Sequence, residues 1–299
     1  PKSSDPCGRI LWGNPLVVND HMAVGRMDYQ WTSSHSLFGR YLIDSSTGPA
    51  PYTLTKNLLS TGTVGADAMA QSFTLGSTYL ITSSVVNALR LTGNRTASQN
   101  EAADYFSMPE LGVKAYLPPG TGRKRTGRIG VTGGPVIGGS IMGGPLKGNF
   151  LGGNDDVTWA IGTHQFAFGV AGGRFTNTDF NKGVDMGELT INGQITGMGM
   201  ADFLTGNVAM WEQASVTRRD EYKWYFGAYA QDTWKVSPRL TANYGVRWEP
   251  FFPSSVTNNA IYNFDLDRFR SGEVSTIYTT APPGLRYPGD PGFPGQSGI

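Results

Sequence analysis

Hydrophobic and polar positions alternate over residues 222–253, and this alternation predicts two long β-strands joined by a short turn. A period of two residues is typical of strands, whose successive side chains point to opposite faces. The Ser-Pro-Arg triplet at 237–239 has the chemistry of a turn. Each predicted strand reaches the roughly 9–11 residues that cross a membrane, whereas ordinary strands average about 5–6. In the second strand the apolar face carries Leu240, Ala242, Tyr244, Val246 and Trp248, and the polar face carries Thr241, Asn243, Gly245, Arg247 and Glu249.

The same alternation recurs along the chain and predicts three further hairpins. Shorter strands and one helical turn complete the pattern, which amounts to about ten strands. The hairpin arms are residues 23–32 with 36–44, 71–82 with 86–98, and 156–161 with 163–175; the shorter strands are 129–132, 188–192 and 208–217, and the helical turn lies within 196–206.

Tight and long connections alternate between these strands, as an up-and-down barrel requires. The long connections are rich in Gly, Pro, Ser and Thr, which predicts irregular surface loops. Outer-membrane barrels combine short periplasmic turns with long extracellular loops. The tight connections lie at 33–35, 83–85, around 162 and at 237–239; the long loops are 45–70, 99–154 and 254–299, and a charged loop is expected at 217–221.

Composition agrees with a β-barrel and excludes other classes. Among 299 residues there are 41 Gly, and aromatic residues reach 12%. Charged residues make up only 16%, against about 25% in soluble domains. The 24 Lys and Arg nearly balance the 23 Asp and Glu, which argues against a nucleic-acid-binding protein. A single cysteine, Cys7, excludes an intramolecular disulfide.

Residues that could carry catalysis or bind a metal are too scattered to predict either. None of the three histidines, His21, His35 and His164, has a Cys, His or Asp neighbour at ligand spacing. We therefore expect no enzymatic activity, no metal and no cofactor. The Gly-rich tract at 127–148 lacks the Walker phosphate-loop pattern and predicts a flexible loop. A basic cluster at 123–125 with Arg128 predicts a solvated loop or a contact to anionic lipopolysaccharide.

Several motifs carry a family resemblance in addition to these patterns. Within residues 229–249, YAQDTWKVSPRLT followed by GVRWE resembles a hairpin of TonB-dependent outer-membrane receptors, and is most similar to their Oar-like group. Five other segments resemble motifs of that family and follow the family's order. They are GRMDYQWTSSHSLFGRY at 25–41, VNALRLTGNR at 86–95, DDVTWAIGTHQFAFGV at 155–170, TGMGMADFLTG at 196–206 and APPGLRYPGDPGFP at 281–294.

This resemblance implies an outer-membrane protein of a Gram-negative bacterium, built as a barrel of about 22 strands around a plug. Residues 1–299 are expected to be a segment of that one barrel domain, without the plug domain and the barrel ends. The implied function is TonB-dependent, active uptake of a scarce substrate. The implied partners are outer-membrane lipid and lipopolysaccharide, the protein's own plug domain, the TonB complex through a missing N-terminal segment, and an unidentified substrate, with no nucleic acid.

Within such a barrel the two faces of each strand have different surroundings. Polar faces must be wet or ion-paired, whereas aromatic side chains gather where the lipid face meets water. The residues expected to line the lumen and contact the plug are Arg26, Asp28, Gln30, Arg40, Arg90, Thr241, Asn243, Arg247 and Glu249. The residues expected to face lipid are Tyr29, Trp31, Tyr41, Tyr244, Val246 and Trp248.

Two alternatives stay open on the sequence alone. One is an outer-membrane barrel that is not coupled to TonB, such as a passive porin or an adhesion receptor, because strand patterns are the same in both. The other is a soluble all-β adhesin or carbohydrate-binding module, in which the aromatic stripes form a core or sugar platforms. Loops of this length argue against the soluble module.

Replacing Val246 with Arg tests the predicted facing of the second strand. A cation near the bilayer midplane costs about 2–4 kcal/mol, so we expect Val246→Arg to disrupt insertion of the barrel. The measurement is membrane insertion and heat-modifiable electrophoretic mobility of the full-length protein. Normal insertion and mobility of the variant would show that the facing is wrong for this strand.

Overall fold

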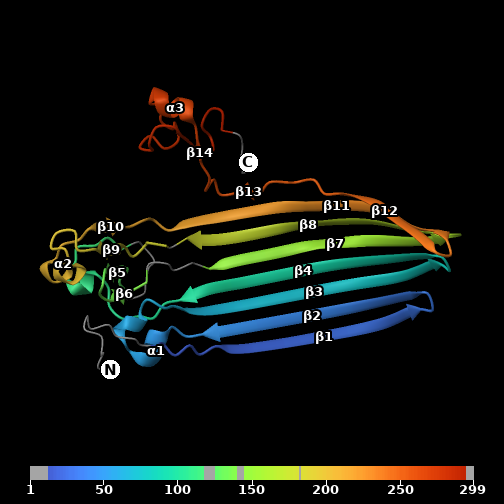
Figure 1. The fold of residues 1–299 in the computed structure, drawn as a ribbon, viewed down its shortest axis with the longest axis horizontal. Helices are drawn as coiled ribbons and strands as arrows, with labels where there is room; N and C mark the ends of the chain where they lie inside the picture. The colour runs from blue at the N-terminus through green and yellow to red at the C-terminus, as the bar shows by residue number, and fades with distance from the viewer. Residues whose placement is uncertain (1–12, 118–124, 140–144, 182, 294–299) are drawn as a thin grey trace.

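The computed structural model describes residues 13–117, 125–139, 145–181 and 183–293, and its largest element is one antiparallel sheet (Figure 1). The strand order is β1-β2-β3-β4-β7-β8-β11-β12, so the chain runs up and down along the sheet. The long strands are β1 (Asn19–Thr32), β2 (His35–Gly48), β3 (Gly65–Thr82), β4 (Val85–Glu101), β7 (Leu146–Ile161), β8 (His164–Asn181), β11 (Thr217–Ser237) and β12 (Leu240–Trp248). The prediction of an all-β, antiparallel, up-and-down fold is confirmed.

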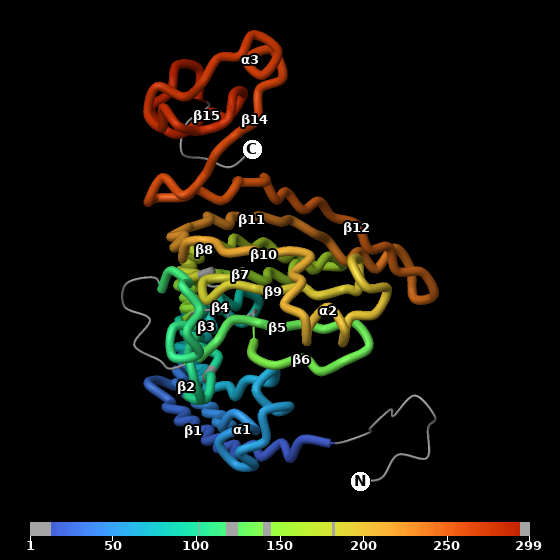
Figure 2. The backbone as a smooth tube through the Cα atoms, turned by 90° about the vertical axis from the view of Figure 1, so that its left-hand side faces the viewer, coloured from blue at the N-terminus to red at the C-terminus, as the bar shows by residue number. Residues whose placement is uncertain are grey.

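Tight turns join the hairpins at one end of the sheet, and the long connections lie at the other end (Figure 1). The turns occupy residues 33–34, 83–84, 162–163 and 238–239, close to their predicted positions. β1 and β12 form the two edges of the path, and the short β13 (Ser255–Val256) pairs with β11 beside β12. Viewed from the loop end, the strands follow an open, curved sheet (Figure 2).

The eight long strands correspond to the arms of the four predicted hairpins, and most of them are longer than the sequence pattern predicts. β7 begins at Leu146 and β3 at Gly65, where irregular loops were expected, and residues 217–221 begin β11 instead of forming a charged loop. Each added segment is paired with a neighbouring strand, which satisfies its backbone N–H and C=O groups. The strands expected at 188–192 and 208–217 do not join this sheet. The main sheet has nine strands among the described residues, eight long ones and the short β13, which is close to the predicted number of about ten.

Three long connections fold together at the loop end into a unit that we call the loop cap, which comprises the described residues of 49–64, 102–139 and 183–216 (Figures 1 and 2). A four-stranded sheet of order β10-β9-β5-β6 forms its centre, and β5 and β9 pair in parallel. Its elements are α1 (Pro51–Thr55), η1 (Leu58–Ser60), η2 (Pro109–Leu111), β5 (Arg128–Val131), β6 (Val136–Ile137), β9 (Glu188–Ile191), α2 (Gly199–Thr205) and β10 (Met210–Glu212).

The most deeply buried side chains of the described residues lie outside the long sheet, and all but Ser275 among the largest of them lie in the loop cap. Three examples are each less than 2% exposed: Ser60 in the first connection, and Met108 and Thr126 in the second. Hydrogen bonds join the connections: the backbone N–H of Gly138 donates to Thr61 Oγ1 at 2.8 Å, and Tyr105 donates to the carbonyl of Thr126 at 3.1 Å. The expectation that these loops are irregular is wrong for their described parts.

Glycine serves close packing in the loop cap. A Cβ atom at Gly127 would lie 1.5 Å from the carbonyl oxygen of Gly187, on another of the three connections. Only glycine permits two backbones to approach so closely. The Gly-rich tract, whose pattern predicts a flexible loop, is packed against its neighbours over residues 127–139.

A buried carboxylate holds the loop that leads into α2. Asp202 is 1% exposed, and it accepts hydrogen bonds from the backbone N–H groups of Thr196 at 2.9 Å and Ile195 at 3.2 Å. Burial alone would raise the pKa of the Asp202 carboxyl, but these hydrogen bonds outweigh burial and hold its pKa below the usual value. The ionised carboxylate is therefore a structural anchor of the TGMGMADFLTG segment.

Residues 255–293 form a smaller lobe after β12, with α3 (Leu266–Ser271) and a short ladder of β14 (Asn263–Phe264) and β15 (Leu285–Arg286). Its anchor is Asp290, which is 4% exposed and accepts hydrogen bonds from Ser275, Thr276 and the backbone N–H of Tyr287. Burial works to raise the pKa of Asp290, and the hydrogen bonds lower it well below its usual value. Among the described residues, no helix is both long and apolar enough to span a bilayer.

The role of Asp202 predicts that Asp202→Asn will loosen one part of the loop cap. An amide offers one acceptor oxygen in place of two, so one of the two backbone N–H groups loses its partner. We expect faster hydrogen exchange and proteolysis within residues 193–206 and unchanged protection of β7 and β8. Acidification of the wild type should have the same effect as the substitution, because folding lowers the pKa of Asp202. Hydrogen-exchange protection of residues 193–206 should be complete above the unfolded carboxyl pKa of about 3.9, and it should fall as the pH drops through the lower pKa of the folded state.

The matched control is Asp104→Asn, because Asp104 is an exposed carboxylate in the same loop cap. Equal protection of residues 193–206 in the wild type and in Asp202→Asn would show that the carboxylate does not anchor this loop.

Candidate functional site

Strand register separates the predicted lumen residues from the predicted lipid residues wherever the ladder reaches them. Directly opposite residues of antiparallel strands share a face. The continuous ladder from β12 to β1 therefore assigns the paired residues of the long strands to one of two faces. Side-chain contacts place the other two: Trp31, at the register shift of β1, stacks on His35 of the apolar face, and Glu249, beyond the end of β12, bonds to Tyr225 of the polar face. The polar face holds Arg26, Asp28, Gln30, Arg40, Arg90, Thr241, Asn243, Arg247 and Glu249; the apolar face holds Tyr29, Trp31, Tyr41, Tyr244, Val246 and Trp248. That the polar face lines a lumen and the apolar face meets lipid stays a prediction.

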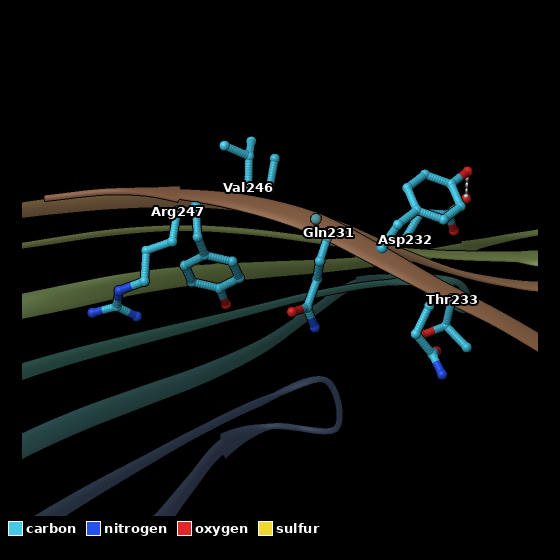
Figure 3. Close-up of a pocket in the computed structure, with 10 residues that line it drawn as sticks. Gln231, Asp232, Thr233, Val246 and Arg247 are labelled. Carbon is cyan, nitrogen blue, oxygen red and sulfur yellow. Dashed lines mark hydrogen bonds between the residues drawn. The ribbon is translucent and has the colours of Figure 1, made fainter.

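Figure 3 shows this separation on the β11–β12 hairpin, where Gln231, Thr233 and Arg247 project to one side and Asp232 and Val246 to the other. The hollow drawn there has a volume of about 750 Å³. Its lining residues come from both faces of the hairpin, so it is a gap beside an edge strand and not an enclosed binding pocket.

At the centre of the polar face, Asp156 on β7 joins side chains from three strands, β4, β7 and β11. Tyr229 on β11 donates a hydrogen bond to Asp156 Oδ1 at 2.8 Å. Arg90 Nη1 on β4 lies 3.7 Å from Asp156 Oδ2, and Asn154 donates to the same oxygen at 2.5 Å. Gly169 on β8 lies between Asp156 and Tyr229, and its missing side chain leaves room for the tyrosine ring to cross β8.

Two further charge clusters flank this centre on the same face. Near the β12 edge, Tyr225 donates to Glu249 Oε1 at 2.7 Å, and the Arg247 guanidinium bonds both of these residues. Near the β1 edge, Arg26 donates to Asp28 at 2.8 Å and its guanidinium lies 4.3 Å from the Phe38 ring centroid. Paired charges of this kind remain compatible with a solvated or protein-covered surface, and they would be costly in lipid.

Arg40 differs from the other polar-face arginines. It lies directly opposite Arg26 in the β1–β2 ladder, and like charges in this position repel. Asp28 neutralises Arg26, whereas Arg40 is exposed and forms no ion pair within the part of the chain that the structure describes. The polar face therefore presents a positive charge between β1 and β3 that another group can neutralise.

The apolar face carries exposed aromatic side chains in two zones. Near the tight turns, Trp31 stacks on His35, with ring centroids 5.3 Å apart, and His35 contacts Tyr79 at 5.0 Å. Toward the loop end, Phe226 and Trp248 form an edge-to-face pair at 5.8 Å. Exposed aliphatic residues cover much of the same face, among them Leu75, Leu89, Leu91, Leu151, Val170 and Val246. Two aromatic girdles around an apolar band are typical of outer-membrane barrels.

Two polar clusters on the apolar face are absent from the sequence predictions. Asp232 is 4% exposed and lies between Tyr244, which donates at 2.7 Å, and His164 Nδ1 at 2.6 Å. Asn87 donates to Asp155 at 2.5 Å. The signal was present in the pattern, because Asp232 and Asp155 occupy positions that alternation assigns to the apolar face. Only the register shows that each carboxylate has a partner on an adjacent strand.

The predicted basic cluster is divided by the structure. Arg125 is 6% exposed and lies 3.4 Å from Asp185, and Arg128 pairs with Glu188. The expectation of a solvated or lipopolysaccharide-binding cluster is wrong for Arg125, which is buried inside the loop cap. The Arg128 side chain is 38% exposed, and its contact with lipopolysaccharide stays a prediction. Residues 123 and 124, like Cys7, lie outside the described part of the chain. Among described residues, no group of three or more His, Cys, Asp or Glu side chains could hold a metal ion.

Comparison with known proteins finds one family and one solved structure. A family model described as "Outer membrane beta barrel domain" matches residues 2–299. The crystal structure of the outer membrane transporter YddB from Escherichia coli is similar with a TM-score of 0.44 and 7% sequence identity, over 84% of this chain. The chain spans 30% of that transporter's chain. A search of curated proteins finds no match.

The packing around Gly169 predicts that Gly169→Ala will break the central polar network. An added Cβ would lie 2.2 Å from Tyr229 Cε1 and 2.4 Å from Asp156 Oδ1, so the ring must move. Overpacking of this kind costs about 1–3 kcal/mol. We expect the folded, fast-migrating form of the protein to convert to the unfolded form at a lower temperature on electrophoresis.

The control is Gly148→Ala, on the same face of β7, where an added Cβ meets nothing within 4 Å. An equal thermal midpoint for the two variants would contradict the role assigned to Gly169.

Proposed function

The chain belongs to the outer membrane β-barrel domain family, and from this premise we propose that it forms part of the wall of a TonB-dependent transporter similar to the Oar-like receptors. The protein is located in the outer membrane. In the proposed function the barrel takes up a scarce substrate actively, with energy delivered through the TonB complex. The chain acts as a transporter and not as an enzyme, and it binds no nucleic acid.

The observation that carries this proposal is the ionic network on the polar face. Its clusters join side chains across the sheet: Asp156 on β7 bonds to Arg90 on β4 and Tyr229 on β11, and Arg247 on β12 bonds to Tyr225 on β11. A face of this kind suits a wide lumen that is filled by a folded plug, because paired side chains can contact protein or water without leaving isolated charges. The unpaired Arg40 is the polar-face residue best suited to meet a carboxylate of the plug or of an anionic substrate.

Orientation follows from the two ends of the sheet. Outer-membrane barrels turn tightly on the periplasmic side and carry long loops outside. The loop cap then lies on the extracellular side, where it meets the substrate first. Its ordered packing supports this role, since a pre-formed surface loses less conformational entropy on binding than a flexible loop.

One rival function remains, and one is excluded. Membership of an outer-membrane barrel family excludes the soluble adhesin or carbohydrate-binding module. A passive porin or an adhesion receptor would have the same alternating strands and the same family membership. The difference lies in the plug and in contact with TonB, so the test must address those two features directly.

We expect the full-length protein to bind the periplasmic domain of TonB and to show no steady conductance in a planar bilayer. A plug that fills the lumen blocks ion flow, whereas a passive porin conducts continuously. The measurements are co-purification with TonB and single-channel recording of the reconstituted protein. Steady conductance without TonB binding would replace this proposal with the porin, and neither conductance nor TonB binding would favour the adhesion receptor.

A further inference from the structure

Three cations lie on the apolar face, at the line where it becomes polar near the loop end. Arg95 on β4, Lys147 on β7 and Arg174 on β8 are all exposed. Register places them on the face of Val246 and Trp248, opposite the polar-face network. We call these three residues the basic row. The face assignment rests on the proposed function, in which this surface meets the membrane.

The three side chains are close enough to contact one ligand. Arg95 pairs with Asn149, and Lys147 lies two residues farther along β7; Arg174 pairs with Leu151. With strands about 4.8 Å apart and a rise of about 3.3 Å per residue, the Cα atoms of the row are separated by roughly 8–14 Å. Extended Lys and Arg side chains bridge such distances to a shared anionic group.

Within the part of the chain that the structure describes, no carboxylate forms an ion pair with the basic row. Among the described residues, none of the three cations has an acidic oxygen within 4 Å, whereas Arg26, Arg90 and Arg247 on the polar face each have one. Arg218, a fourth cation on the apolar face, is paired with Asp220. Asp67 also lies on this face, two strands from Lys147, and forms no ion pair with it. The row therefore carries an excess positive charge that a partner must balance.

The surroundings of the row indicate an amphiphilic partner. Toward the middle of the sheet the same face continues with Leu91 and Leu151, which are 49% and 73% exposed. The Arg174 guanidinium lies 4.7 Å from the Tyr222 ring centroid and 5.6 Å from that of Trp224, which orients it along the surface. A ligand that satisfies both features has an anionic head at the row and apolar chains over the leucines.

We propose that the basic row binds the phosphate groups of a membrane lipid of the outer leaflet. Guanidinium and ammonium groups form strong, charge-assisted hydrogen bonds with phosphate oxygens. The loop end of the sheet is the extracellular end in the proposed function, so the row lies at the level of lipid headgroups there. Bound lipid would fix the depth of the barrel in the membrane and hold β4, β7 and β8 together from outside.

The test uses the full-length protein, purified in detergent and freed of lipid, with lipid A as the bisphosphorylated probe. Native mass spectrometry counts bound lipid for the wild type and for the triple variant R95Q/K147Q/R174Q. Each cation near an anionic lipid surface contributes about fivefold to binding, so we expect the triple variant to bind on the order of 100-fold more weakly. Rising salt should weaken the wild type more than the variant.

Two comparisons make the result specific to this site. Lys223→Gln removes a cation from the loop-end half of β11 on the polar face, and it should leave lipid binding unchanged. Dephosphorylated lipid A should bind the wild type no better than it binds the triple variant. Equal binding of phosphorylated lipid to the wild type and the triple variant, or equal binding of both lipids to the wild type, would overturn the proposal. Competition by inorganic phosphate at similar concentration would also overturn it in favour of a soluble anion site.

A separate measurement distinguishes failure of this site from failure of the face assignment. Leu151→Cys, labelled with a fluorophore in a background free of other cysteines, should be quenched by brominated lipid chains. Thr241→Cys on the polar face should not be quenched. If the label at position 151 is quenched and the triple variant binds lipid as the wild type does, the basic row is rejected as a lipid site and the face assignment stands. If only the label at position 241 is quenched, the face assignment on which the proposal depends is rejected. A dimer that disappears in the triple variant would assign the row to contact with a second copy.

Discussion

The structure depends on one constraint: inside a membrane, every backbone N–H and C=O of a strand must bond to a neighbouring strand. The eight long strands meet this requirement with ladders that run nearly unbroken from the tight turns to the loop cap, such as the one from Thr82 with Val85 to Gly65 with Glu101. Register shifts occur beside the turns, where one residue is bulged. A slip of one residue elsewhere would exchange the two faces of a strand. The ladder thus fixes which side chains lie together.

The polar network and its dependence on small residues both follow from this register. Asp156 can contact Tyr229, Arg90 and Asn154 because three ladders hold four strands in a fixed alignment. The tyrosine crosses an intervening strand only because Gly169 has no side chain. A network spread over several strands resists local movement, since shifting one strand would break bonds on both of its sides. This arrangement suits a barrel wall whose contents move while the wall itself stays fixed.

Sequence pattern alone predicted the faces of the strands well and their lengths poorly. The second strand of the β11–β12 hairpin is predicted at 240–249 and is observed as Leu240–Trp248, because alternation and a strong turn define its ends. β7 begins at Leu146 in a stretch rich in Gly and Asn, residues of low strand propensity, and its pairing with β4 and β8 overrides that propensity. Three short elements of the loop cap, β5, β9 and α2, lie where the sequence pattern predicts two strands and a helical turn. How the connections pack could not be predicted, because Asp202 in the loop cap and Asp290 in the 255–293 lobe act through hydrogen bonds to backbone groups, which leave no periodic trace in the sequence.

The polar residues of the apolar face are of two kinds: some bond to side chains of adjacent strands, and others have no such partner among the described residues. Asp232 and Asp155 lie within the apolar zone, and each bonds to side chains of adjacent strands. An isolated charge there would meet only hydrocarbon, so the protein itself must supply the partner. Arg95, Lys147 and Arg174 lie at the margin of that zone and have no such partner among the described residues. If the margin is the level of the headgroups, the membrane supplies the missing negative charge, and pairing within the protein becomes unnecessary. In the proposed orientation, the change from paired to unpaired charges along this face would then mark the level of the headgroups, independently of the aromatic side chains.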